Sequence, residues 1–167
     1  MIRKTSRLHK QLFASMLPRS LFPKSYLLKA GRVVNSDLSE EADVLINDGK
    51  IEEVGKGLAH KGAEEINCKG KLVIPGGIDT HTHFQLPFMG TSAKDDFNIG
   101  SKAALIGGTT SFIDFVIPNK GESLSAAYKR WRQMADGKVN CDYSLHCAIT
   151  EWNEHTPSEM KKMVQEG

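Results

Sequence analysis

The sequence has 167 residues, of which 40% are hydrophobic and 25% are charged. This is the composition of an ordinary globular protein, and the length is sufficient for a domain with a hydrophobic core. No run of about 18 apolar residues is present, so we expect no membrane-spanning helix. The three cysteines include no CxxC pair, which argues against a zinc ribbon or a disulfide framework and indicates free thiols in a reducing compartment.

Positive charge is concentrated near the N-terminus. Eight of the 22 Lys and Arg residues precede Asp37, the first acidic residue, which leaves 14 basic and 20 acidic residues in the remainder. Residues 1–24 show no clear periodicity, and we expect a basic, disordered extension there. A mitochondrial transit peptide, a nucleic-acid-binding arm and upstream sequence wrongly joined to the start are the other interpretations of this segment.

A small all-β domain is expected at residues 25–72. Two apolar segments within residues 43–55 flank the pair Asp48-Gly49, and an Asp-Gly pair favours the type I′ turn of a β-hairpin. The domain is therefore predicted to contain a hairpin with additional short strands around it. The other expected extended segments are residues 26–28, 32–34 and 64–68.

From residue 73 onward, predicted strands and helices alternate. The expected strands begin at residues 73, 109 and 142, which are 36 and 33 residues apart. A (β/α)₈ barrel averages about 31 residues per unit, so this spacing fits the first three units of a barrel, although a doubly wound sheet would also allow it. On the barrel interpretation residues 73–167 cannot close the barrel, because a fourth strand would begin near residue 175. The expected elements are strands at 73–84, 109–117 and 142–150, and helices at 95–106, from residue 124 and from residue 156.

Capping signals mark where the three helices should begin. Ser92, with an acidic residue three positions later, resembles a capping box for the first helix. Ser123 is the expected cap of the second helix. Thr156 precedes Pro157 and Glu159, which is the order of an N-cap, a first-turn proline and a capping-box glutamate. Each helix is thus predicted to begin within a few residues of a hydroxyl side chain.

The strongest chemical signal is His81-Thr82-His83. Alternate residues of a strand point to the same face, so the two imidazoles should lie side by side. Imidazole is a good ligand for Zn²⁺ and similar ions, but two ligands leave the coordination incomplete, so a catalytic site would need further ligands from other strands. Two histidines that merely end a strand are the alternative. Asp79 lies two residues earlier, from where it would orient a ligand.

Several other residues are expected to be structural. Asp114 lies deep in an apolar strand, where a buried carboxylate needs a hydrogen-bond partner. His146 lies in the middle of the third strand and is predicted to be a core histidine. Tyr128 and Trp131, at helical spacing, are predicted to pack in the core rather than to form a stacking platform.

Much of the sequence from Tyr26 onward resembles the dihydropyrimidinase/hydantoinase family, a group of cyclic amidohydrolases in the amidohydrolase superfamily. The resemblance is highly specific, because it extends over several separate motifs and not over the histidine pair alone. The segments that carry it are residues 73–84, 87–90, 95–97, 102–105, 107–110 and 141–146.

The resemblance implies a TIM-like (β/α)₈ amidohydrolase barrel attached to a small β-sandwich built from both ends of the chain. It implies two zinc ions bridged by a carbamylated lysine, with His81 and His83 binding one zinc. The lysine, the other ligands and the catalytic aspartate belong to later strands, so no catalytic residue is expected in this span. Leu86 and Phe88 match the loop that shapes the substrate pocket, and ordinary loop packing is the alternative for both.

The complete protein is therefore expected to hydrolyse a cyclic amide or ureide, a dihydropyrimidine or hydantoin, to an N-carbamoyl amino acid. This chain alone is expected to be inactive. The resemblance also implies a homotetramer, located in the cytoplasm or, if the basic arm is a transit peptide, in mitochondria. No nucleic-acid or membrane partner is expected.

Two alternatives remain. The collapsin-response mediator proteins, also called dihydropyrimidinase-related proteins, resemble the hydrolases but act as non-catalytic cytoskeletal regulators. They typically replace the second histidine of the motif, whereas this sequence keeps both His81 and His83, which favours the catalytic branch. A truncated gene product without independent function is the other alternative.

Overall fold

The computed structural model describes residues 24–166, and the chain divides between Pro75 and Gly76 into two compact units. Almost all of the predicted basic extension lies outside the described residues. We call residues 24–75 the first unit and residues 76–166 the second unit, and each is described by itself. Within residues 24–166, no helix is long and apolar enough to cross a membrane.

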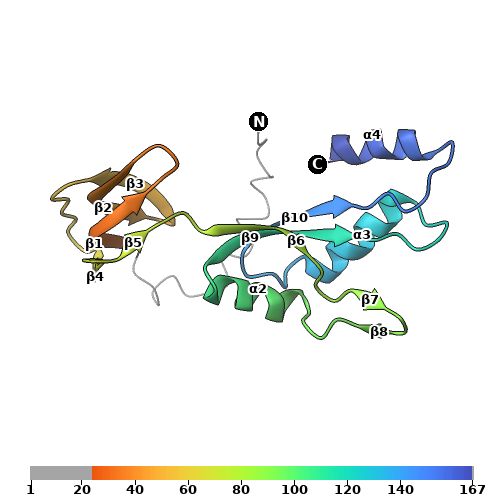
Figure 1. The fold of residues 1–167 in the computed structure, drawn as a ribbon, viewed down its shortest axis with the longest axis horizontal. Helices are drawn as coiled ribbons and strands as arrows, with labels where there is room; N and C mark the ends of the chain where they lie inside the picture. The colour runs from red at the N-terminus through yellow and green to blue at the C-terminus, as the bar shows by residue number, and fades with distance from the viewer. Residues whose placement is uncertain (1–23, 167) are drawn as a thin grey trace. The chain divides into compact units, whose positions relative to one another are not determined.

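The first unit is a single five-stranded sheet (Figure 1). Strand β1 is central: it pairs antiparallel with β2 and parallel with β4 and β5, and β3 pairs antiparallel with β2. The all-β character predicted for this segment is therefore observed. The strands are β1 (Ser25–Val34), β2 (Ser39–Asn47), β3 (Lys50–Gly55), β4 (Glu64–Asn67) and β5 (Leu72–Val73).

The turn between β2 and β3 is the predicted one. Asp48 and Gly49 have φ angles of 47° and 74°, and a type I′ turn requires positive φ at both central residues. Asp tolerates this backbone conformation better than most residues, and Gly adopts it without steric cost. The local sequence therefore specifies this hairpin.

Strand β1 is longer than predicted and contains an irregularity. The two expected short segments form one strand, with a register shift between Leu28 and Gly31 and a positive φ of 58° at Ala30. The carboxylate of Asp43, which is 5% exposed, accepts hydrogen bonds from the Ala30 N–H (2.8 Å) and from the Lys29 ammonium (2.7 Å). It also accepts one from the Leu58 N–H at 3.0 Å. One buried carboxylate thus holds the irregular part of β1, and sequence reasoning did not single it out.

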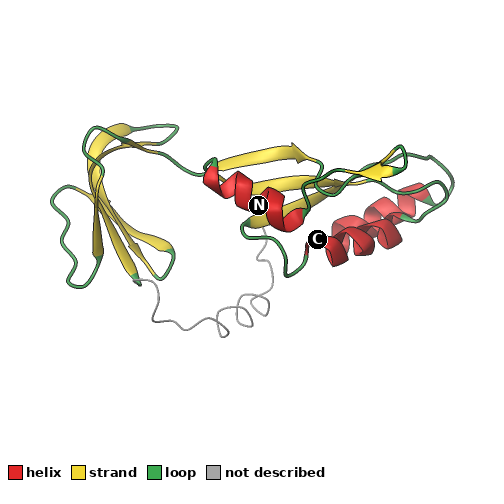
Figure 2. Ribbon diagram, turned by 90° about the horizontal axis from the view of Figure 1, so that it is seen from below, coloured by secondary structure: helices red, strands yellow, loops and turns green. Residues whose placement is uncertain are grey.

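The second unit has the predicted β-α-β-α-β-α order. Its three strands form a parallel sheet in the order β10-β9-β6, and its helices lie along that sheet (Figure 2). A short hairpin, β7 with β8, follows β6. The elements are β6 (Gly77–Thr82), β7 (Pro87–Phe88), β8 (Thr91–Ser92), α2 (Phe97–Ile106), β9 (Thr109–Val116), α3 (Leu124–Ala135), β10 (Asp142–Cys147) and α4 (Thr156–Glu166).

The predicted strand at residues 73–84 is in fact two strands. Val73 belongs to β5 and pairs with Val33 of the first unit, whereas β6 begins only at Gly77. Pro75 between them has no N–H to donate to a ladder. Gly76 lies so close to Thr110 that a Cβ at this position would be 2.1 Å from the Thr110 hydroxyl oxygen. The Pro-Gly-Gly segment therefore ends one sheet and starts the next.

Helix capping agrees with prediction only for α3. Ser123 caps α3 by accepting a hydrogen bond from the Ala126 N–H at 3.2 Å. Helix α2 is capped by Asp96, which accepts from the Ile99 N–H at 2.8 Å, and not by Ser92. Ser92 is unavailable because it belongs to the short strand β8.

The predicted capping box of α4 is also wrong. Thr156 is the first helical residue, and its N–H donates to the Asn153 side-chain oxygen at 3.2 Å. The Glu159 carboxylate accepts a hydrogen bond from the Leu124 N–H at 2.9 Å, so it caps the neighbouring helix α3. The tertiary contact between the two helices replaces the local one.

The core of the second unit lies between the sheet and helices α2 and α3. Trp131 is almost fully buried and Tyr128 packs against the same cluster, as predicted. On α2 the apolar side chains are only partly buried, because Leu105 is 39% exposed. The buried members of the core are Phe97, Phe112, Val116, Ala127, Trp131 and Ala135.

Candidate metal centre

The imidazoles of His81 and His83 converge at the end of β6. Their Nε2 atoms are 3.2 Å apart, and the ring planes are inclined at 77°. Both side chains are exposed. The predicted side-by-side arrangement is therefore observed, with the two ring nitrogens within hydrogen-bonding distance of each other.

This spacing fits two ligands of one metal ion. Two nitrogens bound to zinc at about 2.05 Å and about 109° apart lie roughly 3.3 Å from each other, which is close to the observed separation. Neutral imidazole is also the correct donor type for such an ion. Within residues 24–166, no group of three or more His, Cys, Asp or Glu side chains is arranged to hold a metal. The pair would therefore be two ligands of a metal site whose other ligands are not among the described residues.

The backbone that carries the histidines is irregular. Asp79 pairs with Phe112 and Thr82 pairs with Asp114, so three steps along β6 correspond to two along β9. An extra residue of this kind is a bulge, which redirects nearby side chains. The Asp79 carboxylate accepts a hydrogen bond from the His81 N–H at 3.0 Å. Asp79 thus contacts the backbone of His81, and its role in orienting an imidazole stays a prediction.

An aromatic side chain on β9 supports the imidazoles. The Phe115 ring centroid lies 4.5 Å from that of His81 and 5.4 Å from that of His83. Phe115 was missed in the sequence because only the register of β6 against β9 brings it to the histidines. Its position next to the buried Asp114 was the one available signal, since adjacent strand residues face opposite sides.

The prediction that His146 is a core histidine is wrong. His146 is exposed and pairs in register with Phe115, with ring centroids 5.2 Å apart. Alternation along β10 places this side chain opposite to Tyr143, Leu145 and Cys147, which pack against the core. His146 therefore shares with Phe115 the face of the sheet that also carries the histidine pair.

Asp114 makes the structural hydrogen bonds predicted for it. Its side chain is completely buried, and its Oδ2 accepts from the Thr82 hydroxyl at 2.9 Å and from the Phe84 N–H at 2.8 Å. Burial raises the pKa of Asp114, and the hydrogen bonds from Phe84 and Thr82 oppose that rise. The two residues that donate are the chain neighbours of His83.

The loop after β6 gives a mixed result for the predicted substrate contacts. Leu86 is half-buried and packs against the core cluster of the second unit, and its carbonyl accepts a hydrogen bond from the Ala93 N–H at 2.8 Å. This is the loop packing expected under the alternative interpretation. The side chain of Phe88 lies outside the described part of the structure. Substrate contact stays a prediction for both residues.

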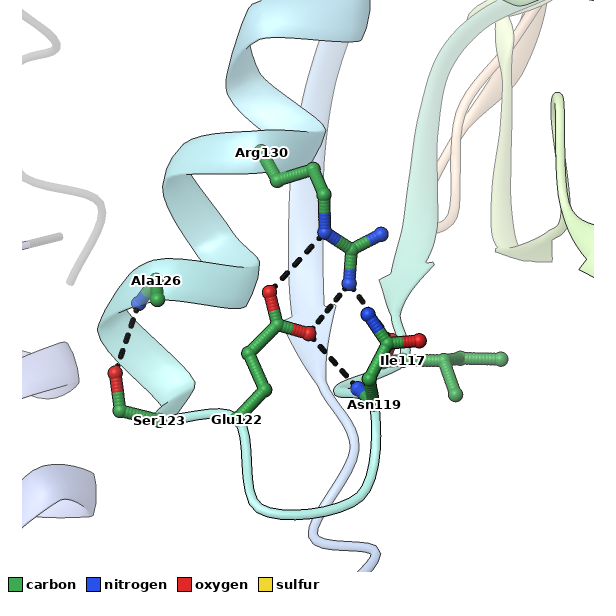
Figure 3. A network of polar contacts seen from close by, with 6 residues as sticks. All are labelled: Ile117, Asn119, Glu122, Ser123, Ala126 and Arg130. Carbon is green, nitrogen blue, oxygen red and sulfur yellow. Dashed lines mark hydrogen bonds and ion pairs between the residues drawn. The ribbon is translucent and has the colours of Figure 1, made fainter.

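The loop after β9 is held against α3 by an ion pair (Figure 3). The Arg130 guanidinium donates to both Glu122 carboxylate oxygens, at 2.6 and 3.1 Å, and to the Ile117 carbonyl at 3.4 Å. The Asn119 N–H also donates to Glu122 at 2.8 Å. Hydrogen bonding from Arg130 lowers the pKa of Glu122. The loop that follows the carboxyl end of β9, the end where a barrel enzyme carries its site, is therefore tied to α3 through Glu122 and Arg130.

The β-α-β-α-β-α unit fits the first units of a (β/α)₈ barrel, and it places the histidine pair near the carboxyl end of its first strand, where barrel enzymes carry their active sites. The family model of the amidohydrolase family matches residues 72–166. A dihydropyrimidinase from Dictyostelium discoideum is 55% identical over 141 residues, covering 84% of this chain and 28% of that protein. Human dihydropyrimidinase-related protein 5 is 52% identical over 141 residues, covering 84% of this chain and 25% of that protein.

The likeness extends to solved structures. A crystal structure of D-hydantoinase superposes with a TM-score of 0.81 at 45% identity, covering 85% of this chain and 31% of that one. The chain belongs to the amidohydrolase family, and within it to the group of dihydropyrimidinases and hydantoinases. Its α/β fold is part of the amidohydrolase fold. The chain spans less than a third of the length of these relatives.

Proposed function

We propose that this chain works as part of a metal-dependent hydrolase that opens the ring of a dihydropyrimidine or hydantoin. The product would be an N-carbamoyl amino acid. The observation that carries the proposal is the 3.2 Å separation of the His81 and His83 Nε2 atoms. The two histidines occur in a chain that is about half identical to a dihydropyrimidinase, and this similarity supports a functional role for a motif that two residues alone would not establish.

The two imidazoles would bind the ion through Nε2. A divalent ion such as zinc, completed by ligands from outside this chain, supplies Lewis acidity and an activated water for attack on an amide carbonyl. Phe115 would limit rotation of the rings and exclude water from one side of them. The second zinc ion and the bridging carbamylated lysine, which the family resemblance implies, are part of the same proposal.

Acid–base catalysis would come from outside these residues. Asp114 is the most deeply buried carboxylate of the second unit, but it faces the core and accepts hydrogen bonds from Thr82 and Phe84. A general base must reach the proton that it removes, and this carboxylate is turned away from the histidine face. The chain by itself is therefore proposed to be inactive in ring opening.

A non-catalytic role is the second candidate, because dihydropyrimidinase-related protein 5 is nearly as similar to this chain as the dihydropyrimidinase is. Overall identity does not separate the two groups. The retention and convergence of both histidines favours the hydrolase, since a regulator has no need for two nitrogens placed 3.2 Å apart. We also propose that the complete protein is a homotetramer and is located in the cytoplasm or in mitochondria.

A chimera tests the proposal. Residues 24–166 would replace the corresponding span of the Dictyostelium dihydropyrimidinase, and opening of dihydrouracil and of hydantoin would be followed by ultraviolet absorbance. We expect a chimera that contains zinc and opens the ring, with loss of at least 100-fold in kcat for His81→Ala and His83→Ala. His155→Ala is the matched control, because its side chain is 76% exposed.

A folded chimera that retains activity without His83 would contradict the proposal. A folded chimera that is inactive with both histidines present would favour the non-catalytic candidate. Circular dichroism of each variant separates these outcomes from a failure to fold.

A further inference from the structure

We propose that Asp114 is a positioning residue for the histidine pair. Its carboxylate, on β9, fixes the two neighbours of His83 and so holds the His83 imidazole toward His81. The inference rests on the proposed function only where it calls the two histidines metal ligands. The positioning itself is a property of the protein without metal.

Asp114 accepts hydrogen bonds from the residues before and after His83. The same oxygen, Oδ2, accepts from the Thr82 hydroxyl at 2.9 Å and from the Phe84 N–H at 2.8 Å. Thr82 and Phe84 immediately precede and follow His83. With both neighbours tied to a single atom, the backbone at His83 has little freedom to rotate.

The sheet itself does not provide this restraint. The β6–β9 ladder is irregular between Asp79 and Thr82, and its last pair is Thr82 with Asp114. His83 therefore lies one residue beyond the end of the ladder. The Asp114 carboxylate takes the place of the backbone acceptor that a regular strand would offer to the Phe84 N–H.

Packing alone does not explain a carboxylate at this position. Asp114 is 0% exposed, between Phe112 and Val116 on the buried face of β9. Burial of a carboxylate costs free energy that an aliphatic side chain would avoid. Within the described residues its Oδ1 has no hydrogen-bond partner. The two hydrogen bonds that the carboxyl group makes go to the segment carrying His83, and an interaction with the buried Trp131 side chain also lowers its pKa.

The other face of the same strand completes the arrangement. Phe115 follows Asp114 in the chain, points to the opposite side and packs against both imidazoles. Two adjacent residues of β9 thus restrain His83: Asp114 restrains its backbone through Thr82 and Phe84, and Phe115 packs against its ring. Outer contacts that orient metal-binding histidines change metal affinity by about 10- to 100-fold when they are removed.

The test compares four variants of the 167-residue chain: Asp114→Asn, Thr82→Val, Thr82→Ser and Asp43→Asn. Asp43 is the matched control, because it is also a buried carboxylate that accepts backbone N–H groups, but in the first unit. The first readout, without metal, is the nuclear Overhauser effect between ring protons of His81 and His83. The second is Zn²⁺ affinity, measured by titration of the imidazole nitrogen shifts.

We expect Asp114→Asn to weaken the ring-to-ring effect and to lower Zn²⁺ affinity about tenfold. Thr82→Val should lower Zn²⁺ affinity by less, because the contact between Asp114 and the Phe84 N–H remains. Thr82→Ser should keep the wild-type affinity, because the hydroxyl is kept. Asp43→Asn should alter neither readout. Circular dichroism melting establishes that each variant is folded.

Unchanged ring-to-ring contact in folded Asp114→Asn and in Thr82→Val would overturn the proposal. If Asp114→Asn does not fold, the difference between Thr82→Val and Thr82→Ser decides, and no difference between them also overturns it. A wild-type chain that does not bind Zn²⁺ would count against the proposed metal site, while the metal-free contact would still decide the role of Asp114.

Discussion

Phe115 packs against the imidazole of His81, with ring centroids 4.5 Å apart and planes inclined at 41°. The same ring lies 5.4 Å from His83. Both imidazoles therefore rest on one aromatic side chain, which reduces the number of rotamers they can adopt. A metal ion that binds the pair encounters rings that are already placed, so less conformational entropy is lost on binding.

Replacement of Phe115 should therefore weaken metal binding without unfolding the chain. For Phe115→Ala we expect a loss of about five- to tenfold in Zn²⁺ affinity, and for Phe115→Leu a smaller loss, because a branched aliphatic group retains part of the contact. Competition with a chromophoric zinc chelator measures both. Ser144→Ala, at an exposed position of β10, is the control. Equal affinity of the wild-type and Phe115→Ala chains would show that the ring has no such role.

The close approach of Gly100 to the Phe84 ring leads to a prediction about packing in the core of the second unit. A Cβ at Gly100 would lie 2.2 Å from the Phe84 ring, and that ring is confined by Phe97 and Phe112. Gly100→Ala should destabilise the second unit by about 1–3 kcal/mol, because the ring must move out of a packed position. Urea unfolding followed by tryptophan fluorescence measures this, since both tryptophans lie in the second unit.

The matched variant is Gly107→Ala. A Cβ there would be no closer than 3.4 Å to any neighbour, so we expect a change below about 0.5 kcal/mol. If the two variants unfold at the same urea concentration, the close contact between Gly100 and Phe84 does not exist in solution.

Asp43 predicts how the first unit responds to acid. The Lys29 ammonium and the Ala30 N–H donate to its carboxylate and hold the pKa of Asp43 below its ordinary value. A lowered pKa stabilises the fold above the unfolded-state pKa of about 3.9, and this contribution is lost as the pH falls below that value toward the folded-state pKa. The first unit should therefore lose stability in that acidic range.

Asp43→Ala should remove this contribution and cost about 2 kcal/mol at pH 7, because the N–H groups of Ala30 and Leu58 and the Lys29 ammonium lose a charged acceptor. Amide exchange rates of β1 and β2, compared at pH 7 and pH 3, measure both effects. A wild-type chain with the same exchange protection at the two pH values, after correction for intrinsic rates, would contradict the prediction.

Glu122 predicts the strength of the β9–α3 connection shown in Figure 3. Its carboxylate accepts two hydrogen bonds from Arg130 and one from the Asn119 N–H. Glu122→Gln should destabilise the second unit by about 1 kcal/mol and reduce the dependence of its stability on salt, because the pair is partly exposed and a charge-assisted bond becomes a neutral one.

The control for this experiment is Glu154→Gln. Glu154 forms an ion pair with His155 in which both side chains are more than three-quarters exposed, and such pairs contribute little. Thermal unfolding at low and high salt compares the two variants. A larger effect of Glu154→Gln would place the stabilising electrostatics elsewhere.

Local sequence signals predicted the elements that depend on neighbouring residues. The Asp48-Gly49 turn, the Ser123 cap and the alternation of strands with helices each follow from residues a few positions apart. The convergence of His81 and His83 belongs to the same category, because the two-residue period of a strand is a local property. The family resemblance rests on such short motifs as well.

Features that depend on strand pairing were not predictable in the same way. The strand expected at residues 73–84 contains the turn-forming segment Pro75-Gly76-Gly77. Its division follows from the pairing of Val73 with Val33, which lies 40 residues away. The Glu159 side chain caps α3 rather than its own helix for a similar reason, since the approach of two helices is a tertiary event.

The sequence by itself determined the class of this protein and the two donor atoms of its candidate metal site. Only the tertiary structure decided what holds those atoms in place. Asp114 and Phe115 lie about 30 residues from the histidines, and the parallel register of β6 against β9 brings one beneath His83 and the other against both rings. The register between two strands depends on how whole strands pack together, so it cannot be predicted from the spacing of residues within either strand.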